Sequence, residues 1–133
     1  MSGKASLYMD YLAQEGYRPT IDSDGDVTFK HEGGSYYIDI TEDDETYFRI
    51  GYPGFWSIES VEELARAIST ANDITATTKV AKVYVRSDGK NTNASIEMFV
   101  DPPENFRSTF TRSMYALQAS VARFRKSMQE TAS

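Results

Sequence analysis

Polar and apolar residues alternate through the segment 35–58, which we expect to form the centre of an antiparallel sheet. Strands place alternate side chains on opposite faces. The stretches 35–41 and 47–52 each carry one apolar face, and the acidic run Glu42–Glu45 lies between them as an exposed loop. This register also sets Asp39 opposite Arg49 as an opposite-charge pair on the outer face. Joining the two apolar faces pairs Ile40 with Phe48, Ile38 with Ile50 and Tyr36 with Tyr52.

Two shorter alternating segments precede this centre, and we expect both to extend the sheet. Thr20–Asp22 and Asp26–His31 flank a turn at Ser23–Gly25, and Gly33-Gly34 suits a two-residue hairpin turn. That second turn would keep consecutive strand pairings on one core face. It sets Phe29 against Ile38 and Val27 against Ile40.

Further along the chain, residues 52–56 are expected to close this part of the sheet with a turn, and two more strands are expected at 80–86 and 94–100. Val83 and Val85 can share the core face, while Tyr84 and its partners point outward. The core set also includes Ile96, Met98 and Val100, and the outward set includes Glu97 and Phe99.

Apolar residues that recur with the helical period of 3.6 residues predict two shorter helices. The first spans residues 5–15 and ends at Gly16, a typical C-cap. The second begins at Ser60, which forms a capping box with Glu63, and ends between Asn72 and Ala76. Its predicted buried stripe consists of Val61, Leu64, Ala65 and Ile68.

The strongest periodic pattern predicts a long C-terminal helix. Asp101 would be its N-cap, with prolines in the first turn. The first four turns are expected to cover the sheet; the last two could pack there or meet a partner helix. The apolar stripe consists of Phe106, Phe110, Met114, Leu117, Val121, Phe124 and Met128.

Composition narrows the class of protein. The 133 residues suit one domain, 1–133, large enough to bury a core, and the absence of cysteine excludes disulfides and thiol nucleophiles. The net charge of −6 argues against nucleic acid as a partner. No apolar run is long enough to span a membrane, and we expect a cytoplasmic protein. The charge is uneven: residues 20–45 are strongly acidic, whereas the C-terminal helix is basic.

The element order and several segments resemble the YbjN-like domain, a group described as proposed bacterial sensory transduction regulators. These segments are Asp22–Asp26, Tyr36–Ile40, Ser57–Leu64 and Asp101–Glu104. The group is similar in fold to type III secretion chaperones. The resemblance covers roughly residues 6–126 and implies a chaperone-like or adaptor role, often as a homodimer, with no cofactor and no catalysis. It supplies no functional residues.

The outer face of the predicted sheet is the leading candidate site. Tyr37, Tyr47, Tyr84 and Phe99 fall on the side away from the predicted core. Aromatic side chains of this kind are common interface anchors. Ordinary strand propensity is the alternative explanation, since Tyr and Phe suit strands anywhere.

Other chemical patterns favour structural roles. Asp22–Asp26 mimics the start of a calcium loop, but its glycine is one position early and Gly33 stands where a bidentate Glu is required. His31 has no partner that would make it a general base. The acidic loop can attract a cation, yet such runs are usually solvated. Phe55 and Trp56 are expected to pack on the start of the second helix.

Together these patterns predict an α+β domain in the order α-β-β-β-(β)-α-β-β-α, with a five- to six-stranded antiparallel sheet covered on one face by the second and third helices. The leading function is non-catalytic protein binding, in which the sheet surface or edge holds a partner segment. We expect no metal site. The alternative is a small-ligand sensor with a pocket near Phe110, Met114 and Trp56.

Overall fold

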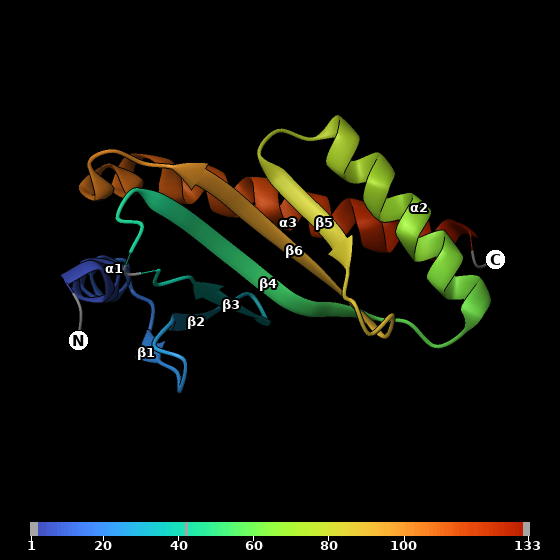
Figure 1. Cartoon of the computed structure of the whole chain (residues 1–133), viewed down its shortest axis with the longest axis horizontal. Helices are drawn as coiled ribbons and strands as arrows, with labels where there is room; N and C mark the ends of the chain where they lie inside the picture. Colours follow the sequence, from blue (N-terminus) through green and yellow to red (C-terminus); the bar gives the residue numbers. More distant parts are fainter. Residues whose placement is uncertain (1–2, 42, 132–133) are drawn as a thin grey trace.

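The computed structural model describes residues 3–41 and 43–131 and has two main layers, an antiparallel sheet and the helix α3 (Figure 1). The sheet has six strands in the order β1-β2-β3-β4-β6-β5. The predicted α+β class and antiparallel sheet are therefore confirmed. The strands are β1 (Thr20–Ile21), β2 (Val27–His31), β3 (Gly34–Ile38), β4 (Tyr47–Ser57), β5 (Ala81–Val85) and β6 (Asn91–Phe99); the helices are α1 (Gly3–Gln14), α2 (Val61–Thr77), the short 3₁₀ helix η1 (Pro103–Asn105) and α3 (Phe106–Thr131).

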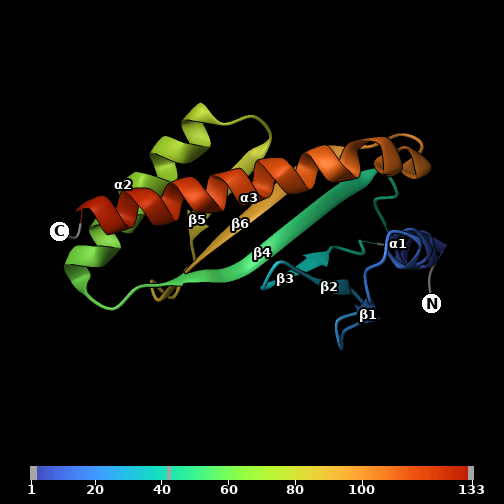
Figure 2. The same cartoon turned by 180° about the vertical axis from the view of Figure 1, so that it is seen from behind.

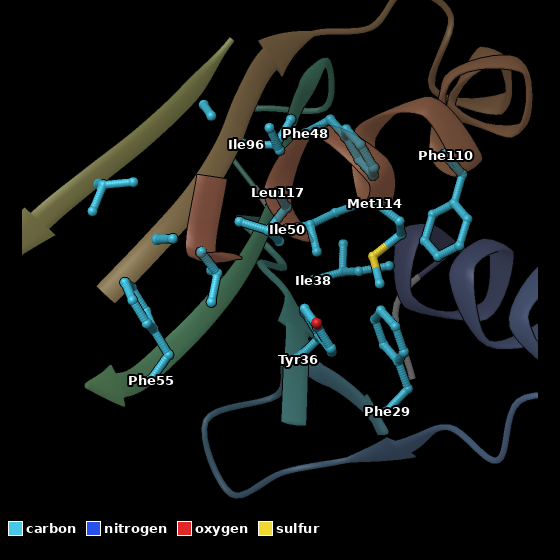
Figure 3. Close-up of a cluster of buried hydrophobic side chains, with 14 of the residues drawn as sticks. Phe29, Tyr36, Ile38, Phe48, Ile50, Phe55, Ile96, Phe110, Met114 and Leu117 are labelled. Atoms are coloured by element: carbon cyan, nitrogen blue, oxygen red, sulfur yellow. The ribbon is translucent and has the colours of Figure 1, made fainter. Parts of the chain in front are cut away.

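One row of apolar side chains crosses five strands beneath α3. Ile38 pairs with Ile50, as predicted, and Ile50 pairs with Ile96. Val27 and Ala81 continue the row on β2 and β5, and all five side chains are buried. Figure 3 shows the isoleucines facing Met114 and Leu117 of α3. This row fixes which face of the sheet is the core.

The helix α3 lies along one face of the sheet, as seen from behind in Figure 2. All seven residues of its predicted stripe are at most 4% exposed. Its last turns pack inside the molecule, because Phe124 contacts the rings of Phe55 and Trp56 and Met128 is fully buried. The helix α1 is also confirmed, and Tyr8 packs edge-on against Phe106 at the start of α3.

The predicted β2–β3 turn is wrong by one position. His31 pairs with Gly34, so the turn residues are Glu32 and Gly33, and Phe29 lies opposite Tyr36 instead of Ile38. Glu32 and Gly33 both have positive φ, 49° and 83°, as a primed hairpin turn requires. The whole register therefore shifts by two residues, which leaves every side chain on its predicted face, with Val27 opposite Ile38.

The predicted turn at residues 52–56 is a bulge inside β4. Pairing with β6 stops after Tyr52 and resumes at Trp56. Gly54 has a φ of 62°, and its N–H donates to the side chain of Asn93 at 2.8 Å. A bulge is a position where a strand tolerates proline, and Pro53 is accommodated there. The strand thereby continues to Ser57, and the N-cap of α2, Ser60, follows shortly after it.

The predicted buried stripe of α2 is wrong for Val61, Ala65 and Ile68, whereas Leu64 is partly buried against the core. Val61 and Ile68 are 79% and 53% exposed, while the buried residues of α2 are Ala67, Ala71 and Ile74. The small alanine face lets α2 pack closely against β5 and α3. The Ser60 cap is confirmed, since its side chain accepts from the Glu63 N–H. The Glu63 carboxylate, however, binds the backbone of Glu59 and the Trp56 indole.

Asp101 is not the N-cap of the long helix. Pro102 occupies the cap position of η1 without a side-chain hydrogen bond, and α3 itself begins at Phe106. Asp101 contributes its backbone carbonyl, which accepts from the Asn105 side chain at 3.2 Å. Pro102 and Pro103 have no backbone N–H to donate, and they favour a tight turn at this point. The helix α3 therefore starts later than the pattern predicted.

The side chain of a threonine in α2 forms hydrogen bonds with the backbone of the edge strand β5. The Thr75 hydroxyl accepts from the Val83 N–H at 2.9 Å and donates to the Val83 carbonyl at 3.0 Å. Val83 is the central residue of β5, which pairs with β6 on its other side. The hydrogen-bonding groups at the middle of this edge are therefore already satisfied.

Candidate functional site

The four predicted aromatic residues lie on the face of the sheet opposite α3, which we call the open face. Figure 1 looks onto this face, with α3 passing behind the strands. It is built by the adjacent strands β3, β4, β6 and β5. These strands supply Tyr37, Tyr47, Tyr84 and Phe99 from the predicted set, together with Arg49, Lys82, Asn93, Ser95 and Glu97.

Tyr47 and Phe99 form the apolar end of the open face. They are directly opposite each other on β4 and β6, with ring centroids 6.5 Å apart. Phe99 is 78% exposed, although it belongs to a well-paired strand. An exposed aromatic ring held on a rigid strand is suited to bury against another molecule, because it loses little conformational entropy on binding.

Tyr37 has a structural role that the sequence did not indicate. Its ring lies over Gly51, the residue opposite it on β4. A Cβ on Gly51 would stand 2.3 Å from the Tyr37 ring, so only glycine fits beneath it. Tyr37 is half-buried for this reason, and burial raises the pKa of its hydroxyl.

Arg49 lies in the middle of the open face between two tyrosines. Its Nη2 donates to Tyr84 Oη at 2.9 Å, and its guanidinium carbon is 5.8 Å from the centre of the Tyr37 ring. The predicted cross-strand neighbour is confirmed at the backbone, where the Asp39 N–H donates to the Arg49 carbonyl at 3.0 Å. The predicted charge pair is not formed: the Asp39 carboxylate accepts from Thr41 instead.

Glu97 is the best-satisfied charged group on the open face. Its carboxylate accepts from Lys82 at 2.7 Å, from Ser95 at 2.9 Å and from the Tyr47 hydroxyl. Burial alone would raise the pKa of Glu97, but these hydrogen bonds outweigh it and lower the pKa to about 2. Burial and the bond to Glu97 raise the pKa of Tyr47 to about 12. Both groups therefore hold one protonation state at neutral pH.

The place predicted for a ligand pocket is filled by side chains. Phe110 and Met114, both labelled in Figure 3, are at most 4% exposed. Phe110 packs against the rings of Tyr11 and Phe29. Trp56 packs against Phe124 and donates its indole N–H to Glu63, which agrees with its predicted position at the start of α2. A separate hollow of about 670 Å³ lies between the α1–β1 loop and the β2–β3 hairpin, near Tyr17 and His31.

The other chemical candidates have structural explanations. The Asp22 carboxylate accepts from the backbone N–H groups of Asp24 and Asp26, both at 2.9 Å, so it closes a turn. His31 packs against Tyr17. Of the acidic loop, Glu42 lies outside the described residues, and the Asp44 carbonyl accepts from Lys4.

Within residues 3–41 and 43–131, no helix combines the length and apolarity needed to cross a membrane. The same residues contain no cluster of three or more His, Asp or Glu side chains that could hold a metal ion.

The comparisons with known proteins rest on structure. No protein-family model and no curated protein sequence matches the chain. An uncharacterized protein from Methanothermobacter thermautotrophicus has a similar structure, with a TM-score of 0.68 over 96% of this chain and 98% of that chain, at 12% identity. YbjN of E. coli, described as a proposed transcription regulator, has a TM-score of 0.63 over 87% of each chain, also at 12% identity.

The chain has a YbjN-like fold. The resemblance predicted from element order is therefore confirmed at the level of architecture. Sequence identity of 12% is too low for residue roles to be carried over, so the YbjN-like fold identifies no binding residue in this chain. The roles of Tyr37, Tyr47, Tyr84 and Phe99 in binding stay predictions.

Proposed function

We propose that this chain is a non-catalytic protein-binding module with a regulatory or adaptor role, which holds an extended segment of a partner on its open face. The observation that carries the proposal is Phe99, a 78% exposed aromatic ring beside Tyr47 on an ordered strand. Both rings are positioned by the backbone, so a partner would bind without first ordering this surface. The proposed regulatory role of E. coli YbjN supports this class of function by fold alone.

The face of the sheet is better suited to this role than its edges. At β5 the backbone groups of Val83 are already bonded to Thr75. At the opposite edge β1 contains only Thr20 and Ile21. Strand addition needs a free row of backbone donors and acceptors, and neither edge offers a long one. The partner segment would therefore be held mainly through side chains.

A small-ligand sensor is the second candidate. The hollow of about 670 Å³ near Tyr17, Phe29 and His31 supports it, because its volume is in the range of ligand pockets. This position differs from the pocket predicted near Phe110. A thermal-shift screen of small molecules on the wild type and on Tyr17→Ala would detect such a ligand, and a shift lost in the variant would favour this function.

The test of the main proposal is affinity capture from lysate of the source organism, followed by mass spectrometry. The baits are the wild type, Phe99→Ser and Tyr115→Ser. Tyr115 is a matched control, because it is a 69% exposed aromatic residue on α3 and lies off the open face. We expect a dominant protein that Phe99→Ser loses and Tyr115→Ser retains. Equal capture by all three baits would contradict the proposal.

A further inference from the structure

Arg49 is a half-buried cation that forms no salt bridge with a carboxylate of the described residues. On the sheet face that carries Arg49, the salt bridge joins Lys82 to Glu97 at 2.7 Å and does not include Arg49. Buried charges are normally paired, because removing an ion from water is costly. Arg49 therefore has an unusual environment for a residue in the middle of a sheet.

Two tyrosines hold the guanidinium of Arg49 in place without forming a salt bridge with it. Tyr84 accepts one hydrogen bond from Nη2, and the Tyr37 ring lies against the group. The Nε atom is enclosed and has no hydrogen-bond partner. A guanidinium has five N–H donors in a planar arrangement that matches a carboxylate, and most of these remain unused here.

The acid opposite Arg49 on the same face interacts with it through charge alone and accepts no hydrogen bond from it. Glu97 lies opposite Arg49 in the β4–β6 pairing, yet its carboxylate is turned to Lys82, Ser95 and Tyr47. Asp39 is occupied by Thr41. The carboxylates of Glu97 and Asp39 thus accept hydrogen bonds from donors other than Arg49. The guanidinium of Arg49 can therefore donate to a carboxylate of another molecule.

We propose that Arg49 binds the carboxylate of an acidic side chain in the partner segment. This inference rests on the proposed function, since it assumes that the open face holds an extended segment. Arg49, with Tyr37 and Tyr84 beside it, is the polar anchor of that face, and the Tyr47–Phe99 pair is the apolar anchor.

The spacing of the two anchors predicts a pattern in the partner. Tyr47 is two residues before Arg49 on β4, and residues i and i+2 of a strand are about 6.6 Å apart. An extended segment running along β4 would repeat that distance. We therefore expect Asp or Glu two positions from an aromatic or aliphatic residue in the bound segment.

The charge of the whole chain favours one carboxylate over a polyanion. At a net charge of −6, a nucleic acid would meet repulsion at many phosphates. A single acidic side chain needs only the local field of Arg49, because salt screens more distant charges beyond about 8 Å. A peptide carboxylate is thus a better match than a phosphate backbone.

The experiment is selection from a displayed library of random nonapeptides, followed by fluorescence anisotropy with an enriched peptide. The baits are the wild type, Arg49→Gln, Phe99→Ser and the control Arg112→Gln, which removes an exposed cation of α3. We expect enriched peptides to carry the acid-and-apolar pattern. Arg49→Gln should weaken binding at least tenfold, and Arg112→Gln should leave it unchanged.

A change on the peptide separates binding from folding, because it leaves the protein intact. Replacing the peptide's acid by its amide should weaken binding to the wild type tenfold and should add no further loss to Arg49→Gln. Enriched peptides that lack acids and depend on Phe99 alone would overturn the Arg49 anchor and leave the proposed function standing. Failure to enrich any peptide that Phe99→Ser loses would overturn both. Tighter binding of a dT12 oligonucleotide than of any peptide would also overturn the carboxylate assignment.

Discussion

Glu97 is bonded to donors from its own strand β6 and from the two neighbouring strands β4 and β5, and its charge is part of what holds the open face together. Its folded-state pKa of about 2 lies below the ordinary value of 4.5. A lowered pKa means that the folded state favours the carboxylate. The stabilisation is therefore fully present above pH 4.5 and is lost as the pH falls from 4.5 towards 2.

We predict that Glu97→Gln lowers the free energy of unfolding at pH 7 by about 1 kcal/mol, because the carboxylate is partly exposed and water screens its bonds. The gap between wild type and variant should narrow as the pH falls from 4.5 to 2.5. Urea unfolding across this range measures it, with Glu45→Gln in an exposed loop as the control. A gap of the same size at pH 7 and pH 2.5 would contradict the assignment.

At this scale the sequence predicted the direction of side chains better than their partners. Strand alternation placed Tyr37 and Phe99 on the outer face correctly, because it depends only on the period of a strand. It missed that Arg49 binds Tyr84 and not Asp39. That choice depends on β6 lying between β4 and β5, and strand order is not visible in local sequence.

Among the elements, α3 was the most predictable and α2 the least. The α3 stripe repeats over seven apolar residues and packs entirely on the sheet side. Apolar side chains lie on two sides of α2, and the structure buries the side that carries the small alanines. Helical periodicity alone favoured Val61, Leu64, Ala65 and Ile68, whereas the structure buries Ala67, Ala71 and Ile74, whose two alanines allow close packing on β5.

The burial of the last turns of α3 leads to a prediction. Met128→Ala should lower the free energy of unfolding by about 2–4 kcal/mol, because it leaves a cavity where a fully buried side chain stood. Gln129→Ala, an exposed neighbour in the same turn, should change it by less than about 0.5 kcal/mol. Chemical denaturation with both variants checks this. Equal and small effects would mean that the helix end does not pack inside the molecule.

At the scale of the whole molecule, the exposed stripe of α2 is relevant to self-association. The resemblance to YbjN-like proteins implied a homodimer, which stays a prediction. Val61 and Ile68 are about two turns apart on the same side of α2 and are both exposed. Burying them against the same helix of a second copy would place an apolar stripe on its own symmetric equivalent.

We predict that the protein dimerises and that Ile68→Glu weakens the dimer at least tenfold, because the paired carboxylates would meet across the symmetry axis. Sedimentation equilibrium over a range of concentrations measures the association constant. Glu62→Gln, on the same helix, is the control. A monomer at all concentrations would exclude the dimer and leave the α2 stripe without a partner.

The candidate site was predicted in part at this scale. Assigning one face of the sheet to the helices left the other face for binding, and all four predicted aromatics lie there. The missed anchor, Arg49, had a weak signal in the sequence: a cation in a strand otherwise rich in aromatics. Its lack of a carboxylate partner is a property of the folded arrangement, because Lys82 and Tyr47 reach Glu97 only after β5, β6 and β4 have assembled.

The two hydrogen bonds between Thr75 and Val83 also affect how the protein behaves at high concentration. A threonine-to-valine change keeps the shape of the side chain but leaves the Val83 N–H and carbonyl without partners. The strand β5 would then present the free N–H and carbonyl of Val83, at the centre of its edge, to the next molecule in solution, and chains would polymerise edge to edge. We expect Thr75→Val to form thioflavin-positive fibrils at concentrations where the wild type remains clear. A single hydroxyl group on α2 would then be what prevents this small sheet from growing into a filament.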